Sequence, residues 1–419
     1  MNKYWIFLFI IFLSCSGKRE IKDKTIIPVA EVVGTGEILN LSDYAKSVKY
    51  IPLETNDLVL ITNIGSIRKL ESAYVVIDSR PGLTSRCLLF DENGTFIKSV
   101  GQQGQGPEEY TTIRSVDVNP KVNRVLLDHD QKCIEYDSDG NLKKIIEVPI
   151  CPDKVFRWGT AQISDSVYLS PLVSPLHRLY KAILFRSDNH TIKLYPNYFG
   201  QEKMGIDKGS WGTLDGRIYR YKEQIRYWRD WDDTIFTFNE KQDVQVAFRF
   251  DFGKYKAPME WLSSFRKDYD QIHYVFPQTA IMESDQYLFL QFHCGRNAPE
   301  KYEYELGGIG QGVRMKRKLV NVTVYGVFDK QTGKLILLNQ PVKHKLGFRN
   351  DLDDGPVFWP KYISSKEEMI TSCSADEFLT AYTQLSNPSS EPSPTMMTVC
   401  PAAFSCSTKL ALSSGRTSA

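Results

Sequence analysis

Short apolar or alternating segments separated by turns recur along most of the chain, and two of these segments match closely. Residues 87–96 (CLLFDENGTF) and 133–142 (CIEYDSDGNL) align without a gap. Each combines an apolar or alternating strand, an Asp-containing turn closed by Gly, and a second strand, which is typical of a β-hairpin. Each hairpin follows another short apolar segment that ends in Asp, at 74–78 and 124–128. The pattern predicts a repeated unit of four short strands.

A four-stranded unit that recurs about every 40–50 residues is the sequence pattern of a β-propeller blade. Helical periodicity is nearly absent and is limited to short candidates at 258–269 and 375–385. We therefore predict an all-β fold, a six-bladed β-propeller with four-stranded blades whose last blade is closed by N-terminal strands. The predicted blades lie at about 64–100, 113–149, 157–198, 213–253 and 278–339, with a sixth that combines 357–373 with strands from 26–53.

The N-terminus has the pattern of an export signal. Basic Lys3 precedes an unbroken apolar run at 4–13, which small Ser14 and then Cys15 follow directly. Ten residues span about 15 Å as a helix, roughly half of a bilayer's hydrocarbon core, so the run indicates a signal peptide rather than a membrane span. Residues 12–15 resemble a bacterial lipobox, which implies lipid attachment at Cys15. The alternative is a signal peptide that is cleaved nearby, with an incidental cysteine.

These features divide the chain into four parts. We expect a lipoprotein signal peptide at 1–14, a lipidated Cys and polar tether at 15–25, and the propeller at 26–385. The Ser/Pro-rich remainder, 386–419, cannot bury a core face and predicts a disordered or out-of-frame tail, with 396–399 its only strand-like stretch. The last blade would then lack an outer strand.

Composition excludes some partners and cofactors. The 52 Lys and Arg residues nearly balance the 50 Asp and Glu residues, so the basic surface of a nucleic-acid-binding protein is not indicated. The eight cysteines include no CxxC pair, which predicts scattered buried thiols rather than disulfides or zinc. We predict that Cys87 and Cys133, at equivalent points of adjacent blades, are too far apart for a disulfide. The sequence thus predicts no metal and no cofactor.

Four further segments resemble a known family, the six-bladed β-propeller lipoproteins of Bacteroidetes, relatives of the NHL-repeat propellers. The segments are 49–55 (KYIPLET), 99–110 (SVGQQGQGPEEY), 233–236 (DTIF) and 350–360 (NDLDDGPVFWP), so the resemblance covers nearly the whole mature chain. It implies the propeller fold and a location in the cell envelope, lipid-anchored to a bacterial membrane on its periplasmic side or at the cell surface. It implies no activity.

The glycine-rich segment 101–107 invites comparison with phosphate-binding loops. Those loops lie between a strand and a helix. Here a strand is expected next, at 114–118, so we interpret the glycines as the crossing between two blades, where close backbone approach and positive φ are needed.

Candidate ligand-binding residues lie at the ends of the second strands. In a propeller these ends share one face with the long loops, and charged and aromatic side chains around a central funnel favour a polar ligand such as a sugar or peptide. The alternative is that acidic residues at strand ends, Asp78 and Asp128 among them, cap turns. The candidates are Arg80, Asp128, His129, Arg229, Trp231, His293 and Arg296.

The function predicted first is a cell-envelope binding or scaffold module for a polar ligand or an envelope protein partner, anchored to the membrane by the N-terminal lipid. The alternative is a propeller enzyme, a lyase or hydrolase with its site in the central funnel. The six histidines form no HxH or HExxH motif, so no catalytic residues are assigned. A sensing or assembly role, in which the propeller docks another protein, is a third hypothesis.

Overall fold

The structure is a computed structural model. It describes residues 23–56, 59–79, 85–152, 156–157, 159–175, 179–197, 213–229, 232–239, 241, 244–258, 271–278, 281–310, 313–383 and 396–401. The predicted signal peptide and Cys15 lie outside the described residues, as do Arg80 and Trp231. In the described part of the chain, no helix is long and apolar enough to cross a membrane.

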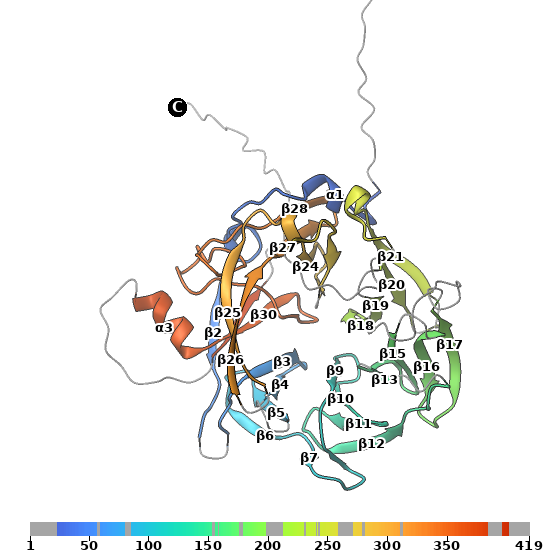
Figure 1. Ribbon diagram of the computed structural model, residues 1–419. Helices are drawn as coiled ribbons and strands as arrows, with labels where there is room; N and C mark the ends of the chain where they lie inside the picture. The colour runs from blue at the N-terminus through green and yellow to red at the C-terminus, as the bar shows by residue number, and fades with distance from the viewer. Residues whose placement is uncertain are drawn as a thin grey trace, which may run out of the picture.

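The chain forms antiparallel sheets arranged in a ring around a central axis, which is the architecture of a β-propeller (Figure 1). The predicted all-β propeller fold is confirmed. The first two sheets are regular four-stranded units in chain order, as the repeat predicts. They consist of β3 (Ile64–Lys69), β4 (Ala73–Asp78), β5 (Arg86–Asp91) and β6 (Phe96–Ser99), and of β9 (Ser115–Asn119), β10 (Arg124–His129), β11 (Lys132–Asp137) and β12 (Leu142–Glu147).

The repeated Asp and Gly residues form the turns between the third and fourth strands. The Asp91 carboxylate accepts hydrogen bonds from the backbone N–H groups two and four residues later, at 2.8 Å each. Asp137 accepts the equivalent bonds at 3.1 and 2.8 Å. Gly94 and Gly140 have φ of 86° and 71°, a conformation that glycine adopts without strain. The predicted hairpins are therefore confirmed.

The third and fourth units are joined into one ten-stranded sheet, so the ring has five large sheets rather than the six separate blades that we predict from the sequence. The reason is the length of β15, whose end, Val173–Pro175, pairs with the start of β18. The strands are β13 (Phe156–Arg157), β14 (Ala161–Ser164), β15 (Val167–Pro175), β16 (Tyr180–Arg186), β17 (Thr191–Pro196), β18 (Thr213–Tyr221), β19 (Gln224–Arg229), β20 (Thr234–Phe238), β21 (Val244–Phe250) and β1 (Ile26–Ile27).

The next sheet carries a long insertion. It consists of β22 (Phe276–Pro277), β23 (Met282–Glu283), β24 (Tyr287–His293), β27 (Thr323–Asp329) and β28 (Lys334–Leu337). Between β24 and β27 the chain leaves the sheet as a separate hairpin of β25 (Tyr302–Gly310) and β26 (Val313–Asn321), drawn in orange in Figure 1.

The last sheet closes the ring with strands from both ends of the chain. Its order is β2 (Lys49–Pro52), β31 (Met396–Pro401), β30 (Glu368–Cys373) and β29 (Tyr362–Ile363). The N-terminal segment therefore pairs with the C-terminal one, as predicted for Lys49–Pro52. Two related predictions are wrong. Ile26–Ile27 pairs in parallel with β21 instead, and Val29–Val32 forms the helix α1.

The predicted tail also needs correction. Met396–Pro401, which we place in a tail at 386–419, is an interior strand hydrogen-bonded to β2 on one side and to β30 on the other. The sheet thus has four strands, and the expectation that it lacks an outer strand is wrong. The sequence marks 396–399 as strand-like, but the Ser and Pro residues on both sides of this short stretch are typical of a disordered tail.

Helices are few and short among the described residues. Besides α1 there are α3 (Ala375–Thr383), as predicted for 375–385, and the 3-10 turns η1 (Leu41–Asp43), η3 (Gly253–Tyr255) and η5 (Gly295–Asn297). The other predicted helix, 258–269, lies outside the described residues apart from its first position.

The glycine-rich segment is a crossing between the first two sheets. Its short strands β7 (Gln102–Gln103) and β8 (Glu109–Tyr110) pair in parallel, and the Glu109 side chain accepts a hydrogen bond from the Gly106 N–H at 2.8 Å. Gly101 has φ of 68°, and a Cβ there would collide with the Tyr136 hydroxyl. The glycines are thus explained by backbone geometry at this crossing.

Five described cysteines are buried, as predicted: Cys87, Cys133, Cys151, Cys294 and Cys373. Cys87 and Cys133 occupy equivalent positions in β5 and β11, and neither forms a disulfide. Burial raises the pKa of both thiols, which keeps them protonated and unreactive.

Candidate functional site

The second strands of four units end on one face of the ring, which we call the long-loop face. β4 ends at Asp78, β10 at His129, β19 at Arg229 and β24 at His293. Equivalent strands of a propeller run in the same direction, so these ends share one face. The predicted residues outside the masked segments therefore lie on or near this face, with Arg296 just beyond it in η5.

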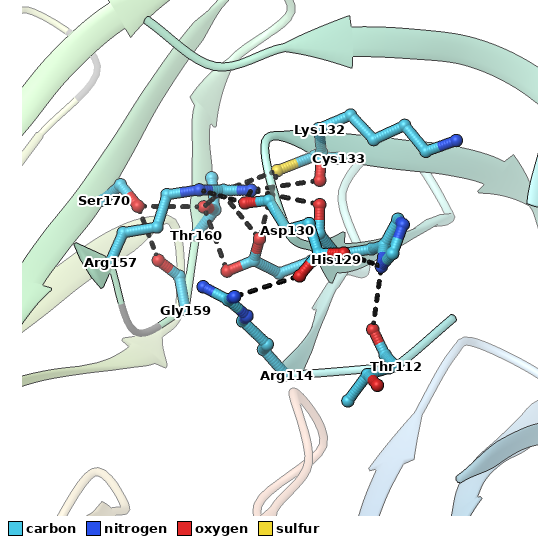
Figure 2. A network of polar contacts seen from close by, with 11 residues as sticks. Thr112, Arg114, His129, Asp130, Lys132, Cys133, Arg157, Gly159, Thr160 and Ser170 are labelled. Atoms are coloured by element: carbon cyan, nitrogen blue, oxygen red, sulfur yellow. Dashed lines mark hydrogen bonds and ion pairs between the residues drawn. The ribbon is translucent and has the colours of Figure 1, made fainter. Parts of the chain in front are cut away.

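Asp128 belongs to a buried network that joins two units of the ring, and Figure 2 labels its partners Arg157, Thr160 and Cys133. Its side chain is 0% exposed, and Arg157 of β13 approaches its Oδ1 at 2.6 Å. The same guanidinium donates to the backbone carbonyls of Asp130 at 2.6 Å and Lys132 at 3.1 Å. Burial raises the pKa of Asp128, and the charge of Arg157 acts in the opposite direction. The geometry favours the alternative reading of Asp128 as a structural residue.

The other predicted residues are also engaged with the protein, at separate places. His129 lies 3.0 Å from the Thr112 carbonyl through Nδ1 and is 6% exposed. Arg229 is 2% exposed and donates to Asn197 at 2.9 Å. The ring of His293 stacks on Phe276 with centroids 4.6 Å apart, and exposed Arg296 lies 3.2 Å from His273. None of these residues lines the two cavities described next.

A cavity of about 280 Å³ lies between the inner strands; we call it the channel cavity. Its walls come from β3, β9, β14, β18, β23 and β29. Figure 1 shows β3, β9 and β18 on the inner side of the ring. Four cationic and two acidic side chains line it: Arg68, Arg217, Arg220, Lys361, Asp117 and Glu283.

Both acidic side chains are already paired with arginine. Arg220 of β18 approaches Asp117 of β9 at 2.6 Å, across the intervening unit. Glu283 accepts hydrogen bonds from Nε and Nη2 of Arg226, at 2.9 and 3.1 Å, and contacts Lys330 at 3.0 Å. The two carboxylates are thus each bound to an arginine, and the short contacts of Arg68 and Lys361 lie elsewhere.

A second cavity, of about 600 Å³, opens on the long-loop face; we call it the mouth cavity. Arg68, Met282 and Lys361 line both cavities, so the two spaces meet at these residues. Aromatic and polar side chains line the rest of the mouth cavity, among them Tyr50, Gln291, Tyr325, Trp359, Thr371 and Ser372. Together the cavities form a funnel of the size that small-molecule ligands occupy.

Arg68 and Lys361 are accessible cations at the junction of the two cavities. Half-buried Arg68 donates to Ser66 Oγ and to the Ile67 carbonyl, at 2.8 Å each, and lies 5.3 Å from the centre of the Tyr362 ring. Exposed Lys361 donates to Ser372 Oγ at 2.8 Å. The surrounding protein removes water from both groups and thereby lowers the pKa of each. Their short contacts are with hydroxyl, carbonyl and aromatic groups rather than with carboxylates.

These residues are absent from the candidates named from the sequence, although a signal for them exists. Inner strands carry a charged side chain in an otherwise apolar or alternating context, at Arg68 of β3, Asp117 of β9, Arg220 of β18 and Glu283 of β23. Because alternate residues of an inner strand face the axis, such positions predict the channel lining. We placed the candidates at strand ends instead.

The funnel offers groups that can bind a ligand. Among the described residues, no three His, Cys, Asp or Glu side chains lie close enough together to hold a metal ion. The cations, hydroxyls and amides at the junction can donate hydrogen bonds to an anionic or hydroxylated ligand, and the aromatic rings can pack against its apolar faces.

Two solved structures from Bacteroides are similar to this chain. A putative exported protein from Bacteroides fragilis is 17% identical with a TM-score of 0.58, over 90% of this chain and 99% of that one. A member of the DUF4221 family from Bacteroides vulgatus is 13% identical with a TM-score of 0.48, over 85% and 96% of the two chains. At such identities the first likeness concerns the fold alone. No curated protein matches the sequence.

The family assignment rests on the sequence itself. A family model described as "Domain of unknown function (DUF4934)" matches residues 24–399, which include every strand of the ring up to the middle of β31. The chain therefore belongs to the DUF4934 family.

Proposed function

We propose that this protein is a binding module of the bacterial cell envelope that takes a polar ligand into the mouth cavity on the long-loop face. One observation carries the proposal: two cavities of about 600 and 280 Å³ meet at Arg68 and Lys361, whose short contacts are with uncharged groups. Half-buried Arg68 is partly desolvated, which costs stability that a bound anionic ligand would offset. A binding role explains why the cations lie there.

Blocking the mouth cavity tests the proposal. Ser372 lines this cavity and lies in β30. We expect Ser372→Trp to abolish binding to whichever members of a glycan and peptide array the wild-type protein retains, because the indole would fill the entrance. Leu142→Trp places the same ring on the outer strand β12, away from the funnel, and should leave binding unchanged. Array binding that survives Ser372→Trp would place the site elsewhere, and a wild-type protein that retains nothing would count against a binding role.

We further propose that the mature protein is anchored to a bacterial membrane through lipid on Cys15. The proposal is supported by the order of features at the N-terminus. An apolar run too short to span a bilayer is followed by Ser14, Cys15 and a polar segment. Cys15→Ala should abolish labelling by a radioactive fatty acid and release the protein from the membrane fraction. Cys87→Ala is the matched control and should change neither result. Unchanged membrane association of Cys15→Ala would contradict the anchor.

We also propose that the ring consists of six repeated units, or blades, two of which are joined in the ten-stranded sheet. The support is that the ten-stranded sheet contains two complete four-stranded units, β14–β17 and β18–β21, which are joined only at the end of β15. The relation to NHL-repeat propellers stays a prediction from the sequence.

A further inference from the structure

We infer that the ligand of the funnel is a small molecule that carries a carboxylate, which is bound between Arg68 and Lys361 where the mouth and channel cavities meet. This inference rests on the proposed function and names the ligand class for the same site.

The charge around the funnel favours an anion. Asp117 and Glu283, the acidic side chains of the channel cavity, are each bound to an arginine at 2.6 and 2.9 Å, and Glu283 also binds Lys330. In the mouth cavity, the carboxylate of Glu377 lies 4.0 Å from Lys345. The hydrogen bonds of Arg68 and Lys361 are to uncharged groups, although the charge of Asp117 acts on Arg68 and that of Glu377 acts on Lys361. Cationic side chains outnumber acidic ones around both cavities, so a ligand anion would improve the charge balance at the junction.

The geometry of the donors favours a carboxylate. The guanidinium of Arg68 is held beside the Tyr362 ring and by Ser66, so its orientation is fixed before a ligand arrives. A planar guanidinium matches the two oxygens of a carboxylate, and the ammonium of Lys361, which lines the same two cavities, adds a point charge. The channel cavity of about 280 Å³ accepts one small unit and no folded segment. An acidic sugar fits these conditions, since its hydroxyls can pair with Ser and Thr hydroxyls and with Gln291 at the mouth.

The test compares an acidic sugar with its uncharged counterpart. Isothermal titration calorimetry at low ionic strength would measure a galacturonate oligomer and the same oligomer after reduction of its carboxylates to alcohols. We expect the wild-type protein to bind the acidic form about tenfold or more tightly than the reduced form, because hydrogen bonds to charged groups are the strong ones. The double variant Arg68→Gln/Lys361→Gln should lose this preference. The matched control, Arg186→Gln/Lys193→Gln, removes two cations from the outer strands β16 and β17 and should keep it.

The outcomes separate this inference from the proposed function. If the acidic and reduced forms bind equally well and Ser372→Trp abolishes both, the site does not recognise a carboxylate. The proposed binding site would still stand. If the variant Arg68→Gln/Lys361→Gln still prefers the acidic form, Arg68 and Lys361 do not bind the carboxylate. Tighter binding of galactose 6-phosphate than of galacturonate would overturn the choice of a carboxylate over a phosphate. Binding of neither oligomer contradicts the inference, whereas retention of a neutral glycan that Ser372→Trp abolishes would still support the proposed function. Thermal unfolding of each variant shows whether it is folded.

Discussion

Replacing Arg157 with Met is expected to lower the free energy of unfolding by about 3–5 kcal/mol, because it leaves the buried Asp128 carboxylate without its cation. Asp128 is 0% exposed, and Arg157 also donates to the carbonyls of His129, Asp130 and Lys132. One substitution would thus leave a buried charge and several backbone acceptors without their donor. Urea denaturation followed by tryptophan fluorescence measures the change.

The pH dependence of this variant tests the cause of the loss. Without Arg157, the folded-state pKa of Asp128, which burial already raises, rises further above the unfolded value. The folded state then binds the proton more tightly than the unfolded state, so the variant should regain stability as the pH falls through that folded-state pKa. The double variant Arg157→Met/Asp128→Asn should lie closer to the wild type at neutral pH. A loss independent of pH would instead point to packing.

An exposed ion pair gives the matched control for Arg157. Arg186 contacts Asp188 at 2.6 Å, but about half of each side chain is exposed, 49% and 57%. Surface pairs contribute little to stability because water and salt screen them. Arg186→Met should therefore be indistinguishable from the wild type in the same denaturation. A comparable loss in both variants would show that removal of any arginine has this effect, and would contradict a special role for the buried network.

Deleting the C-terminal strand is expected to abolish cooperative unfolding altogether. Strand β31 lies between β2 and β30, so a chain that stops after Thr395 loses the hydrogen bonds on both sides of an interior strand. The ring would be left open, with two unpaired strand edges that promote aggregation. Circular dichroism during heating and size-exclusion chromatography measure the loss. We expect no sharp transition and largely aggregated protein.

A slightly longer truncation is the control. A chain that stops after Pro401 retains every strand that the structure describes, so it should melt as the full chain does. Cooperative melting of the shorter chain would show that β31 is dispensable for closure. Equal failure of both truncations would assign the effect to residues beyond 401.

The turns show what local sequence can predict. The third-to-fourth-strand hairpins were predictable because Asp91, Gly94, Asp137 and Gly140 act within their own turns, through hydrogen bonds that span two to four residues and through positive φ. The strand β31 was not predictable in the same way. Its pairing partners, β2 and β30, lie far away in the chain, and its Ser/Pro-rich surroundings resemble a disordered segment.

The candidate site was only partly predictable, for a related reason. The ends of the second strands were correctly expected on the long-loop face, but Asp128 and Arg229 are buried among protein partners there. Whether a charged residue faces a ligand or a neighbouring strand depends on the partner that packs against it. Arg157, which lies far beyond Asp128 in the chain and belongs to another sheet, decides this for Asp128.

The sequence by itself determined the repeated four-stranded unit, the turns within it and the all-β propeller, because alternation, turn residues and repeat spacing act over a few residues at a time. Only the tertiary structure decided how the units join, which strand closes the ring and where the cavities meet. The joining of β15 to β18, the position of β31 and the approach of Arg68 to Tyr362 each depend on residues from different parts of the chain. Such contacts form between segments that lie apart along the chain, so the pattern within a single segment cannot predict them.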